Sequence, residues 1–372
     1  MSSVSFPSLF PGMLLDAAQR YAQDHAGAAT IEGDPVRELG WTATLVAEES
    51  GGVGGTLADL ASIVEGLATH GLQLPVVETC AVVPLLLKSA APEVAGRWLE
   101  AVAEGSAQVA PLCALSATPD EIAVQARHLD IGYELSGRVL GADATLPATH
   151  WLVPAWVDGE AALFLVDAER IGAPVASYRT MEGRRGADFV LDKLTLPESA
   201  CIARGAAARD ALAAATDAAL LLTATDTVAA LAALIQQTTT HLKERRQFGV
   251  SLSTFQVLRH RVADMYVKYL GAKGLVIHCF HAHEQDAPDL RRTLRLAKVS
   301  LAESARACAE AAIQMHGGMG VSEEVLATRL AQRLLASEFR YGDRLAHAAL
   351  LLAPATTEST PSLSSNLAGS AR

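Results

Sequence analysis

The middle of the chain changes its sequence texture, and this change constrains the fold more than any single motif. Between about residues 108 and 202 helical periodicity stops, and short β-rich pieces separated by Gly, Pro and Asp replace it. These pieces are Tyr133-Glu-Leu-Ser-Gly137, Trp151-Leu-Val153, Ala162-Leu-Phe-Leu-Val166 and Phe189-Val-Leu191. Helical patterns precede and follow the stretch. The sequence therefore predicts an α+β protein with a small β-domain between two helical domains.

The two flanking parts repeat apolar residues at helical spacing. Before the β-rich stretch, examples are residues 57–67 and 82–87. After it, one predicted buried stripe is Phe255, Leu258, Val262, Met265, Tyr269 and Ala272, and the next is Leu294, Ala297, Leu301, Ala305, Cys308 and Ala312. Long helices with such stripes favour a four-helix bundle.

These patterns divide the chain into four predicted segments. They are an N-terminal helical domain (residues 1–105), a middle β-domain (106–204), a C-terminal four-helix bundle (205–353) and a tail (354–372). The tail is rich in Ser and Thr and lacks periodicity, so we expect it to be disordered.

Composition narrows the class of partner. The net charge of -11 over 372 residues argues against a general nucleic-acid or anionic-membrane surface. Five cysteines without a Cys-x-x-Cys pair, and no signal-peptide pattern, predict a reduced, cytoplasmic protein. The most apolar run, residues 211–235, is interrupted by Asp217 and Asp226 and falls short of about 18 uninterrupted apolar residues. We therefore expect a buried helix there and no membrane span.

A first turn suited to an anion joins two predicted bundle helices. It begins Glu244-Arg-Arg-Gln-Phe-Gly249, and Ser253 or Thr254 is expected to cap the helix that follows. An arginine before a helix start can grip a phosphate with its planar fork of donors, and Gln256 adds an amide. The alternative is a surface turn whose arginines pair with Glu244.

A second turn of this kind ends the next long helix, in Gln314-Met-His-Gly-Gly-Met-Gly320. Its glycines allow backbone to approach a ligand closely, and His316 is expected to be a ligand-side contact or a cap. Two such turns on one bundle suggest a dinucleotide. A third glycine cluster, Ser50-Gly-Gly-Val-Gly-Gly55, follows no strand and lacks the third glycine of a nucleotide loop, so we interpret it as a turn.

Motifs along nearly the whole chain resemble those of the flavin-dependent acyl-CoA dehydrogenases. In the N-terminal part they are Leu39-Gly-Trp41 and Glu48-Glu-Ser-Gly-Gly52, and in the middle part Leu135-Ser-Gly137, Leu165-Val-Asp167 and Gly186-Ala-Asp188. In the C-terminal part they are Arg245-Arg-Gln-Phe-Gly249, Phe255-Gln256, Ala263-Asp-Met265 and Gln314-Met-His-Gly-Gly318. The resemblance implies the fold of that family and FAD as cofactor.

In that family the dinucleotide tail of FAD reaches across a subunit interface. The resemblance therefore implies that this chain holds the tail of an FAD whose ring lies in a partner. The matching positions are Arg245, Gln247, Phe248, Gln256, Gln314, Gly317 and Gly318.

The flavin-ring contacts of the family have no counterpart here. Family enzymes carry a threonine-glutamate-proline and glycine-serine-aspartate loop and then a tryptophan-threonine or similar pair. The corresponding regions read Ala114-Leu-Ser-Ala-Thr-Pro-Asp-Glu-Ile-Ala123 and Ser136-Gly-Arg-Val-Leu-Gly-Ala142. Groups that would bond the ring and tune its electronics are missing.

The catalytic base of the family also lacks a counterpart. Its position, a glutamate before a glycine-threonine pair, falls on Tyr341, and the alternative site of some members falls near Ala219. A tyrosine with a pKa near about 10 is a poor base at neutral pH. Glu338 is the fallback base, although it is expected to be a solvated partner of Arg340 or Arg344.

Other titratable groups have more ordinary explanations. We expect Asp343 to close a turn, and Asp217 and Asp226 to cap helices or lie on the surface. His278, His281 and His283 lack a carboxylate at ligand spacing, so no metal site is predicted.

These observations predict the non-catalytic subunit of a heteromeric acyl-CoA dehydrogenase, with α2β2 stoichiometry. The partner would bind most of the acyl-CoA, and electrons would pass to an electron-transfer flavoprotein. Heteromeric members are associated with steroid side-chain thioesters. Three alternatives stay open: a homomeric dehydrogenase using Glu338, a flavin monooxygenase on the same fold, and a non-enzymatic scaffold.

Overall fold

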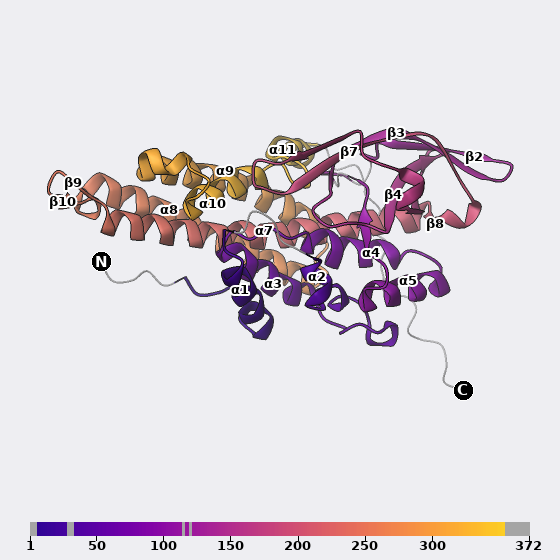
Figure 1. Cartoon of the computed structure of the whole chain (residues 1–372), viewed down its shortest axis with the longest axis horizontal. Coiled ribbons are helices and arrows are strands. Elements are labelled where there is room, and N and C mark those ends of the chain that lie inside the picture. The colour runs from indigo at the N-terminus through magenta and orange to yellow at the C-terminus, as the bar shows by residue number, and fades with distance from the viewer. Residues whose placement is uncertain (1–5, 28–32, 114–115, 119–120, 354–372) are drawn as a thin grey trace.

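The computed structural model of the chain describes residues 6–27, 33–113, 116–118 and 121–353 (Figure 1). The predicted tail, residues 354–372, lies outside the described residues. The N-terminal part is helical, as expected. Its elements are α1 (Met13–Asp24), α2 (Pro35–Glu38), η1 (Trp41–Ala43), η2 (Glu48–Ser50), α3 (Leu57–Thr69), the π-helical turn η3 (Val77–Val82), α4 (Val83–Leu87) and α5 (Pro92–Glu104).

The middle part forms an eight-stranded sheet in the order β6-β7-β3-β2-β4-β5-β8, with β1 paired to β4. The strands are β1 (Val109–Pro111), β2 (Val124–Leu129), β3 (Gly132–Asp143), β4 (His150–Val157), β5 (Glu160–Asp167), β6 (Ala176–Arg179), β7 (Arg185–Leu196) and β8 (Cys201–Arg204), with the short helix α6 (Ala168–Ile171) and the turn η4 (Glu198–Ala200). The four β-rich pieces of the sequence lie in β3, β4, β5 and β7. A strand-rich domain between helical parts is confirmed.

The C-terminal part consists of long helices. They are α7 (Ala206–Glu244), α8 (Gln256–Glu284), α9 (Leu290–His316), α10 (Leu326–Ser337) and α11 (Arg344–Leu352), with β9 (Arg246–Gln247), β10 (Val250–Ser251), η5 (Leu252–Thr254) and η6 (Gly317–Val321) between them. The six predicted stripe residues of α9 are all buried, and four of the six predicted for α8 are. The apolar spacing therefore identified the core faces of this bundle correctly.

The long helix α7 organises the molecule. It contacts α3 and α4 of the N-terminal part, α8, α9 and α10 of the bundle, and β5 and β8 of the sheet. One apolar core joins the N-terminal helices to the bundle, and a second lies within the sheet. In Figure 1 the β9–β10 hairpin lies at one end of the long axis and the sheet at the other.

In the described part of the chain, α7 alone has the length and apolar composition of a membrane span. Its most apolar window is 89% buried inside the protein. The buried helix expected for residues 211–235 is therefore confirmed as the core of the bundle.

The glycine cluster after η2 forms a tight turn. Gly51 adopts a left-handed conformation, and a Cβ on Gly52 would lie 2.0 Å from the carbonyl oxygen of Val46. Backbone packing therefore accounts for these glycines, in agreement with the sequence interpretation.

Candidate functional site

The first predicted anion turn is a β-hairpin that projects from the end of α7. Gln247 pairs with Val250 and Arg246 with Ser251. Phe248 and Gly249 form its tip, with φ angles of 53° and 80°. The hairpin leaves Phe248 89% exposed, so this end of the bundle presents an aromatic side chain to solvent.

Ser251 fastens the hairpin to α7. Its hydroxyl lies 2.9 Å from the carbonyl oxygens of Leu242 and Lys243 and 2.8 Å from the Ser253 hydroxyl. The Thr254 hydroxyl donates back to the Ser251 carbonyl at 2.7 Å. These side chains are used within the turn.

The predicted cap of α8 is therefore wrong. The helix begins at Gln256 with Phe255 as its N-cap residue, and no side chain caps it. Because Ser253 and Thr254 are engaged in the preceding 3-10 turn, neither is available to the first turn of α8.

The second turn follows α9 directly. Gly317 has a φ of 60° and ψ of -135°, a conformation that favours glycine. A Cβ added to Gly317 or Gly318 would meet no atom within 4 Å, whereas one on Gly320 would lie 2.4 Å from the Ile313 carbonyl oxygen. Gly320 is therefore needed for packing, and Gly317 and Gly318 leave their backbone accessible.

Two histidines join the two turns. The ring of His316 stacks on that of His241, with centroids 4.3 Å apart, and its Nε2 lies 3.3 Å from the Thr238 hydroxyl. Burial, with a contribution from His241, lowers the pKa of His316 to about 4. Of the two expected roles of His316, a ligand-side contact does not fit a side chain that is buried between helices as a neutral ring. His316 is the N-cap residue of η6, but its side chain makes no capping hydrogen bond.

The seven predicted cofactor residues are all exposed at this end of the bundle. They are Arg245, Gln247, Phe248, Gln256, Gln314, Gly317 and Gly318. In the described part of the chain the side chains of Arg245, Gln256 and Gln314 form no hydrogen bond or ion pair, so the expected alternative of an Arg245–Glu244 pair is not found. A guanidinium, two amides and open glycine backbone fit the phosphates and hydroxyls of a dinucleotide tail. We call this surface the tail face; its role in binding stays a prediction.

The region that corresponds to the ring site lines a cavity between the sheet and α7. The cavity encloses about 260 Å³, and its polar side chains include Ser116, Thr118 and Arg138. Ser116 donates to the carbonyl oxygen of Thr118 at 3.0 Å, within its own turn. Residues 114–115 and 119–120 of the loop lie outside the described residues.

Tyr341, on which the sequence predicts the position of the family base to fall, is buried next to a carboxylate. It follows α10 with a φ of 59° and is 7% exposed. Its hydroxyl donates to Glu78 Oε1 at 2.8 Å, and Arg340 donates to the same oxygen at 2.9 Å. The other oxygen of Glu78 forms an ion pair with Arg184 at 2.9 Å. Arg184 in turn pairs with Asp143.

This charge cluster, Glu78, Asp143, Arg184, Arg340 and Tyr341, joins all three parts of the chain. Glu78 lies in η3, Asp143 ends β3, Arg184 precedes β7, and the other two follow α10. Two carboxylates face two guanidinium groups, so the cluster is balanced in charge. Buried charges need this kind of pairing, because an unpaired one would be strongly destabilising.

The cluster fixes the protonation of its acids. Burial raises the pKa of Glu78, but Arg184 and Arg340 outweigh burial and bring that pKa to about 2. Burial and the Glu78 carboxylate both raise the pKa of Tyr341. At neutral pH Glu78 is therefore ionised and Tyr341 carries its proton.

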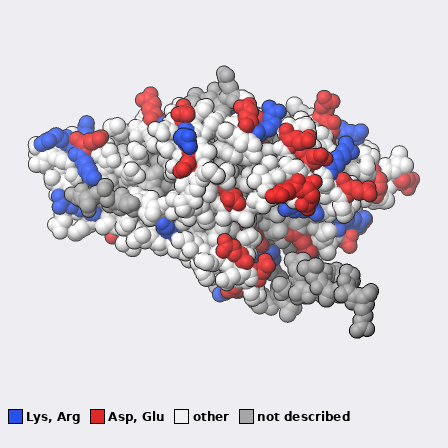
Figure 2. Space-filling model, turned by 90° about the horizontal axis from the view of Figure 1, so that it is seen from below, with Lys and Arg blue, Asp and Glu red and all other residues white. Residues whose placement is uncertain are grey.

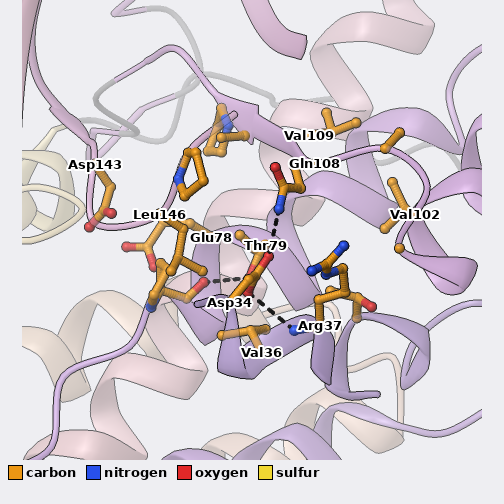
Figure 3. Close-up of a pocket in the computed structure, with 17 residues that line it drawn as sticks. Asp34, Val36, Arg37, Glu78, Thr79, Val102, Gln108, Val109, Asp143 and Leu146 are labelled. Atoms are coloured by element: carbon orange, nitrogen blue, oxygen red, sulfur yellow. Dashed lines mark hydrogen bonds between the residues drawn. The ribbon is translucent and has the colours of Figure 1, made fainter. Parts of the chain in front are cut away.

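The space beside the cluster is small. It encloses about 30 Å³ between the helical part and the sheet, with Glu78 and Asp143 in its lining. Gln108 reaches Asp34 across it at 3.2 Å, and Asp34 also accepts from the Arg37 backbone N–H (Figure 3). Such a volume holds one or two water molecules, whereas ligand pockets are typically roughly 300–1,000 Å³.

Glu338, the fallback base, is held by two arginines. It is buried, with one oxygen 2.7 Å from Arg306 and the other 3.1 Å from Arg344. The expectation of a solvated side chain is wrong, and of the two expected partners only Arg344 is found. Asp343 caps α11 by accepting from the backbone N–H groups of Leu345 and Ala346, which confirms its turn role.

The aspartates of α7 form ion pairs. Asp217 pairs with Arg291 at 3.0 Å. Asp226 is 2% exposed and pairs with Arg333, so the expected capping or surface role is wrong for it. Ala219, the alternative base position, is buried. No group of three or more His, Cys, Asp or Glu side chains among the described residues suits a metal ion.

Two family models match this chain. The N-terminal domain of acyl-CoA dehydrogenase matches residues 13–106, and its C-terminal domain matches residues 210–348. The chain belongs to the acyl-CoA dehydrogenase family. This result agrees with the motifs and with the order of helical, β and helical parts.

Individual acyl-CoA dehydrogenases are similar along most of the chain. Acyl-CoA dehydrogenase IpdE2 of Mycobacterium tuberculosis is 28% identical over 84% of this chain and 86% of that protein. A chain of the ChsE4-ChsE5 complex from the same organism has a TM-score of 0.78 at 21% identity and covers 94% of this chain and 100% of that one. A variant of the Tcur3481-Tcur3483 steroid ACAD has a TM-score of 0.77 at 25% identity, covering 91% and 95%.

The acyl-CoA dehydrogenase fold places the sequence-predicted site residues in two separate locations. The seven tail residues gather at the hairpin end, whereas Tyr341 lies in the charge cluster where the three parts meet. Sequence reasoning missed Glu78 and Arg184. The sequence did contain a signal for Glu78, which is the one charged residue within residues 72–87. Because so apolar a stretch is expected to be buried, its single carboxylate needs a cation as partner.

Proposed function

We propose that this chain is the non-catalytic subunit of a heteromeric acyl-CoA dehydrogenase. Its task is to hold the dinucleotide tail of FAD, and a partner chain supplies the ring site, the acyl-CoA pocket and the catalytic glutamate. The complex removes hydrogens from the α and β carbons of a CoA thioester. FAD supplies the hydride acceptor when bound.

The observation that carries the proposal is the closed charge cluster at the base position. A general base must offer a free acceptor to the proton it removes. Tyr341 is protonated and bound to Glu78, and both oxygens of Glu78 face cations. Glu338 is likewise occupied by Arg306 and Arg344. The space beside Glu78 and Asp143, about 30 Å³ in the described part of the chain, has room for one or two water molecules.

The tail face supports the second half of the proposal. Arg245, Gln256 and Gln314 are exposed and without partners among the described residues, which suits a ligand that another chain brings. Arg245 would grip phosphate, and the two amides and the backbone at Gly317 and Gly318 would bond the remaining oxygens. The rest of the ligand would belong to the partner.

Similar proteins favour a heteromer and a steroid-type substrate. One structural neighbour is the ChsE4-ChsE5 complex, and another is the Tcur3481-Tcur3483 steroid ACAD. By analogy we infer an α2β2 assembly and a steroid side-chain thioester as substrate. We further infer a cytoplasmic location and an electron-transfer flavoprotein as acceptor, both from the sequence and its family.

The proposal is tested by measuring dehydrogenation of steroid side-chain CoA thioesters by this chain alone and together with a catalytic relative. We expect the complex to be active and the isolated chain to be inactive. Glu338→Gln in this chain should leave the rate of the complex unchanged. Turnover by the isolated chain that Glu338→Gln abolishes would replace the proposal with a self-sufficient dehydrogenase.

A further inference from the structure

The last turn of α7 places a titratable side chain between the two turns of the tail face. His241 lies in that helical turn, and the backbone N–H of Arg245 donates to its carbonyl oxygen at 2.9 Å. The ring of His241 stacks on that of His316, which directly precedes Gly317 and Gly318. His241 therefore adjoins both the exposed arginine and the glycine turn.

Of the two stacked rings, that of His241 is the one that can exchange a proton with water. His316 is 7% exposed, and its Nδ1 is buried without a hydrogen-bond partner among the described residues. A proton on this ring would place a charge in a buried site without a counter-ion, so His316 stays neutral. His241 is only partly buried, and water can supply its proton.

The surroundings of His241 favour its neutral form. Burial and the Arg245 guanidinium lower its pKa below the ordinary value of 6.5, and Glu244 raises it by a smaller amount. The group that faces it from α9 is the neutral ring of His316, and the η6 turn that follows has no titratable side chain. The hairpin adds an exposed cation, Arg246, and Figure 2 shows lysine and arginine side chains gathered at this end of the molecule.

A phosphate held by Arg245 would reverse this balance. It would offset the charge of the guanidinium and add negative charge beside the imidazole, and a nearby anion favours a protonated histidine. The end of α7 acts in the same direction, because the carboxyl end of a helix favours a cation. Since an unperturbed histidine titrates close to neutral pH, a modest change in its surroundings is enough to change its charge.

We propose that His241 is a further residue of the tail face and takes up a proton from water when the dinucleotide tail of FAD binds. The imidazolium then adds a second cation to the site, beside Arg245. This inference rests on the proposed function, since FAD is the ligand assigned to the tail face there. Binding and proton uptake are reciprocal, so FAD affinity rises as the pH falls.

Calorimetric titration of the apo-complex with FAD measures both quantities. We expect wild type to bind FAD about 3- to 10-fold more tightly at pH 5.5 than at pH 8, which corresponds to a rise of half a unit to one unit in the pKa of His241. At pH 6.5, titrations in two buffers of different ionisation enthalpy should show uptake of a fraction of a proton for each FAD bound.

Two substitutions and a control assign the proton to His241. His241→Phe keeps a ring to stack on His316 but cannot be protonated, so it should lose this pH dependence and the proton uptake. His241→Lys carries a permanent charge and should bind FAD at pH 8 about as tightly as wild type does at pH 5.5. The control is His128→Phe, an exposed histidine of β2 at the opposite end of the molecule, which should behave as wild type (Figure 1).

The outcomes separate this inference from the proposed function. A complex that binds FAD with the same pH dependence in wild type and His241→Phe would overturn the role of His241 and leave the subunit role intact. An isolated chain that binds FAD with a pH dependence removed by His241→Phe would keep the role of His241 and overturn the shared site. If no complex binds FAD, both proposals fail.

Discussion

The charge cluster and the tail face use arginine in opposite ways. In the cluster Arg184 is buried and Arg340 is partly buried, and both face Glu78, so their charges hold three parts of one chain together. On the tail face Arg245 is exposed and has no partner among the described residues. A guanidinium group that is paired with carboxylates stabilises the fold, whereas an exposed guanidinium group beside a hairpin can bind a ligand.

This contrast supports our proposal that the chain does not carry the catalytic base itself, although it belongs to a family of enzymes. Tyr341, the predicted base position, lies in the closed charge cluster, and the residues that match the family's tail motifs lie on the exposed tail face. Desolvated ions are stable only when they are fully paired, so the cluster cannot release a carboxylate without losing stability.

The largest expected effect is at Glu78. Glu78→Gln leaves Arg340 without its counter-charge and Arg184 with Asp143 alone in a largely desolvated site, which should lower the free energy of unfolding by about 3 kcal/mol. Urea unfolding at pH 7 measures this loss. The control is Glu100→Gln, an exposed residue of α5, which should change stability by less than about 0.5 kcal/mol. Equal, small effects for both variants would show that the cluster does not hold the parts together.

The contribution of Glu78 should also depend on pH. Its pKa is about 2 in the folded chain against an ordinary value of 4.5, so its contribution is complete above pH 4.5 and disappears as the pH falls through 2. The stability difference between wild type and Glu78→Gln should therefore shrink, by roughly 3 kcal/mol in all, between those values. Urea unfolding of both proteins at a series of pH values checks the direction. A difference that grows toward low pH would contradict the pairing with Arg184 and Arg340.

On the tail face the expected loss is of binding alone. Arg245→Ala removes charge-assisted bonds to phosphate and should weaken FAD binding by the complex about 10- to 100-fold. Because Arg245 is exposed, the thermal midpoint of the isolated chain should stay the same. Fluorescence titration of the apo-complex with FAD measures the affinity, with Arg20→Ala, an exposed residue of α1, as control. Unchanged affinity in both variants would remove Arg245 from the tail face.

The smallest effect is expected at Tyr341. Tyr341→Phe removes the hydrogen bond to Glu78 while Arg340 still holds the same oxygen, so the free energy of unfolding should fall by about 1 kcal/mol. Turnover by the complex should not change. The control is Tyr178→Phe, whose hydroxyl bonds Asp188 on the surface. A loss of turnover confined to Tyr341→Phe would give Tyr341 a catalytic role and break the contrast between the two regions.

Local patterns in the sequence predicted the helical and strand-rich parts and most of the buried stripes. These depend on residues three or four positions apart, as in the stripe of α9. The error at Ser253 and Thr254 was also local, because both could cap α8 and competing bonds within the 3-10 turn prevailed.

The charge cluster could not be predicted in this way, because its partners are far apart in the chain. Arg340 and Glu78 are 262 residues apart, and Arg333 and Asp226 are 107 apart. Residue types alone made Asp226 and Glu338 look exposed, since most acids are. Only the packing of α7 and α10 against their neighbours showed that arginines compensate these buried charges.

The most direct test of the account is the flavin content of the purified chain, measured by absorbance together with native mass spectrometry. The account predicts a colourless chain when it is expressed alone, and a yellow heterotetramer with one FAD for each pair of unlike chains when the catalytic relative is present. A yellow chain that binds one FAD per copy without any partner would contradict it.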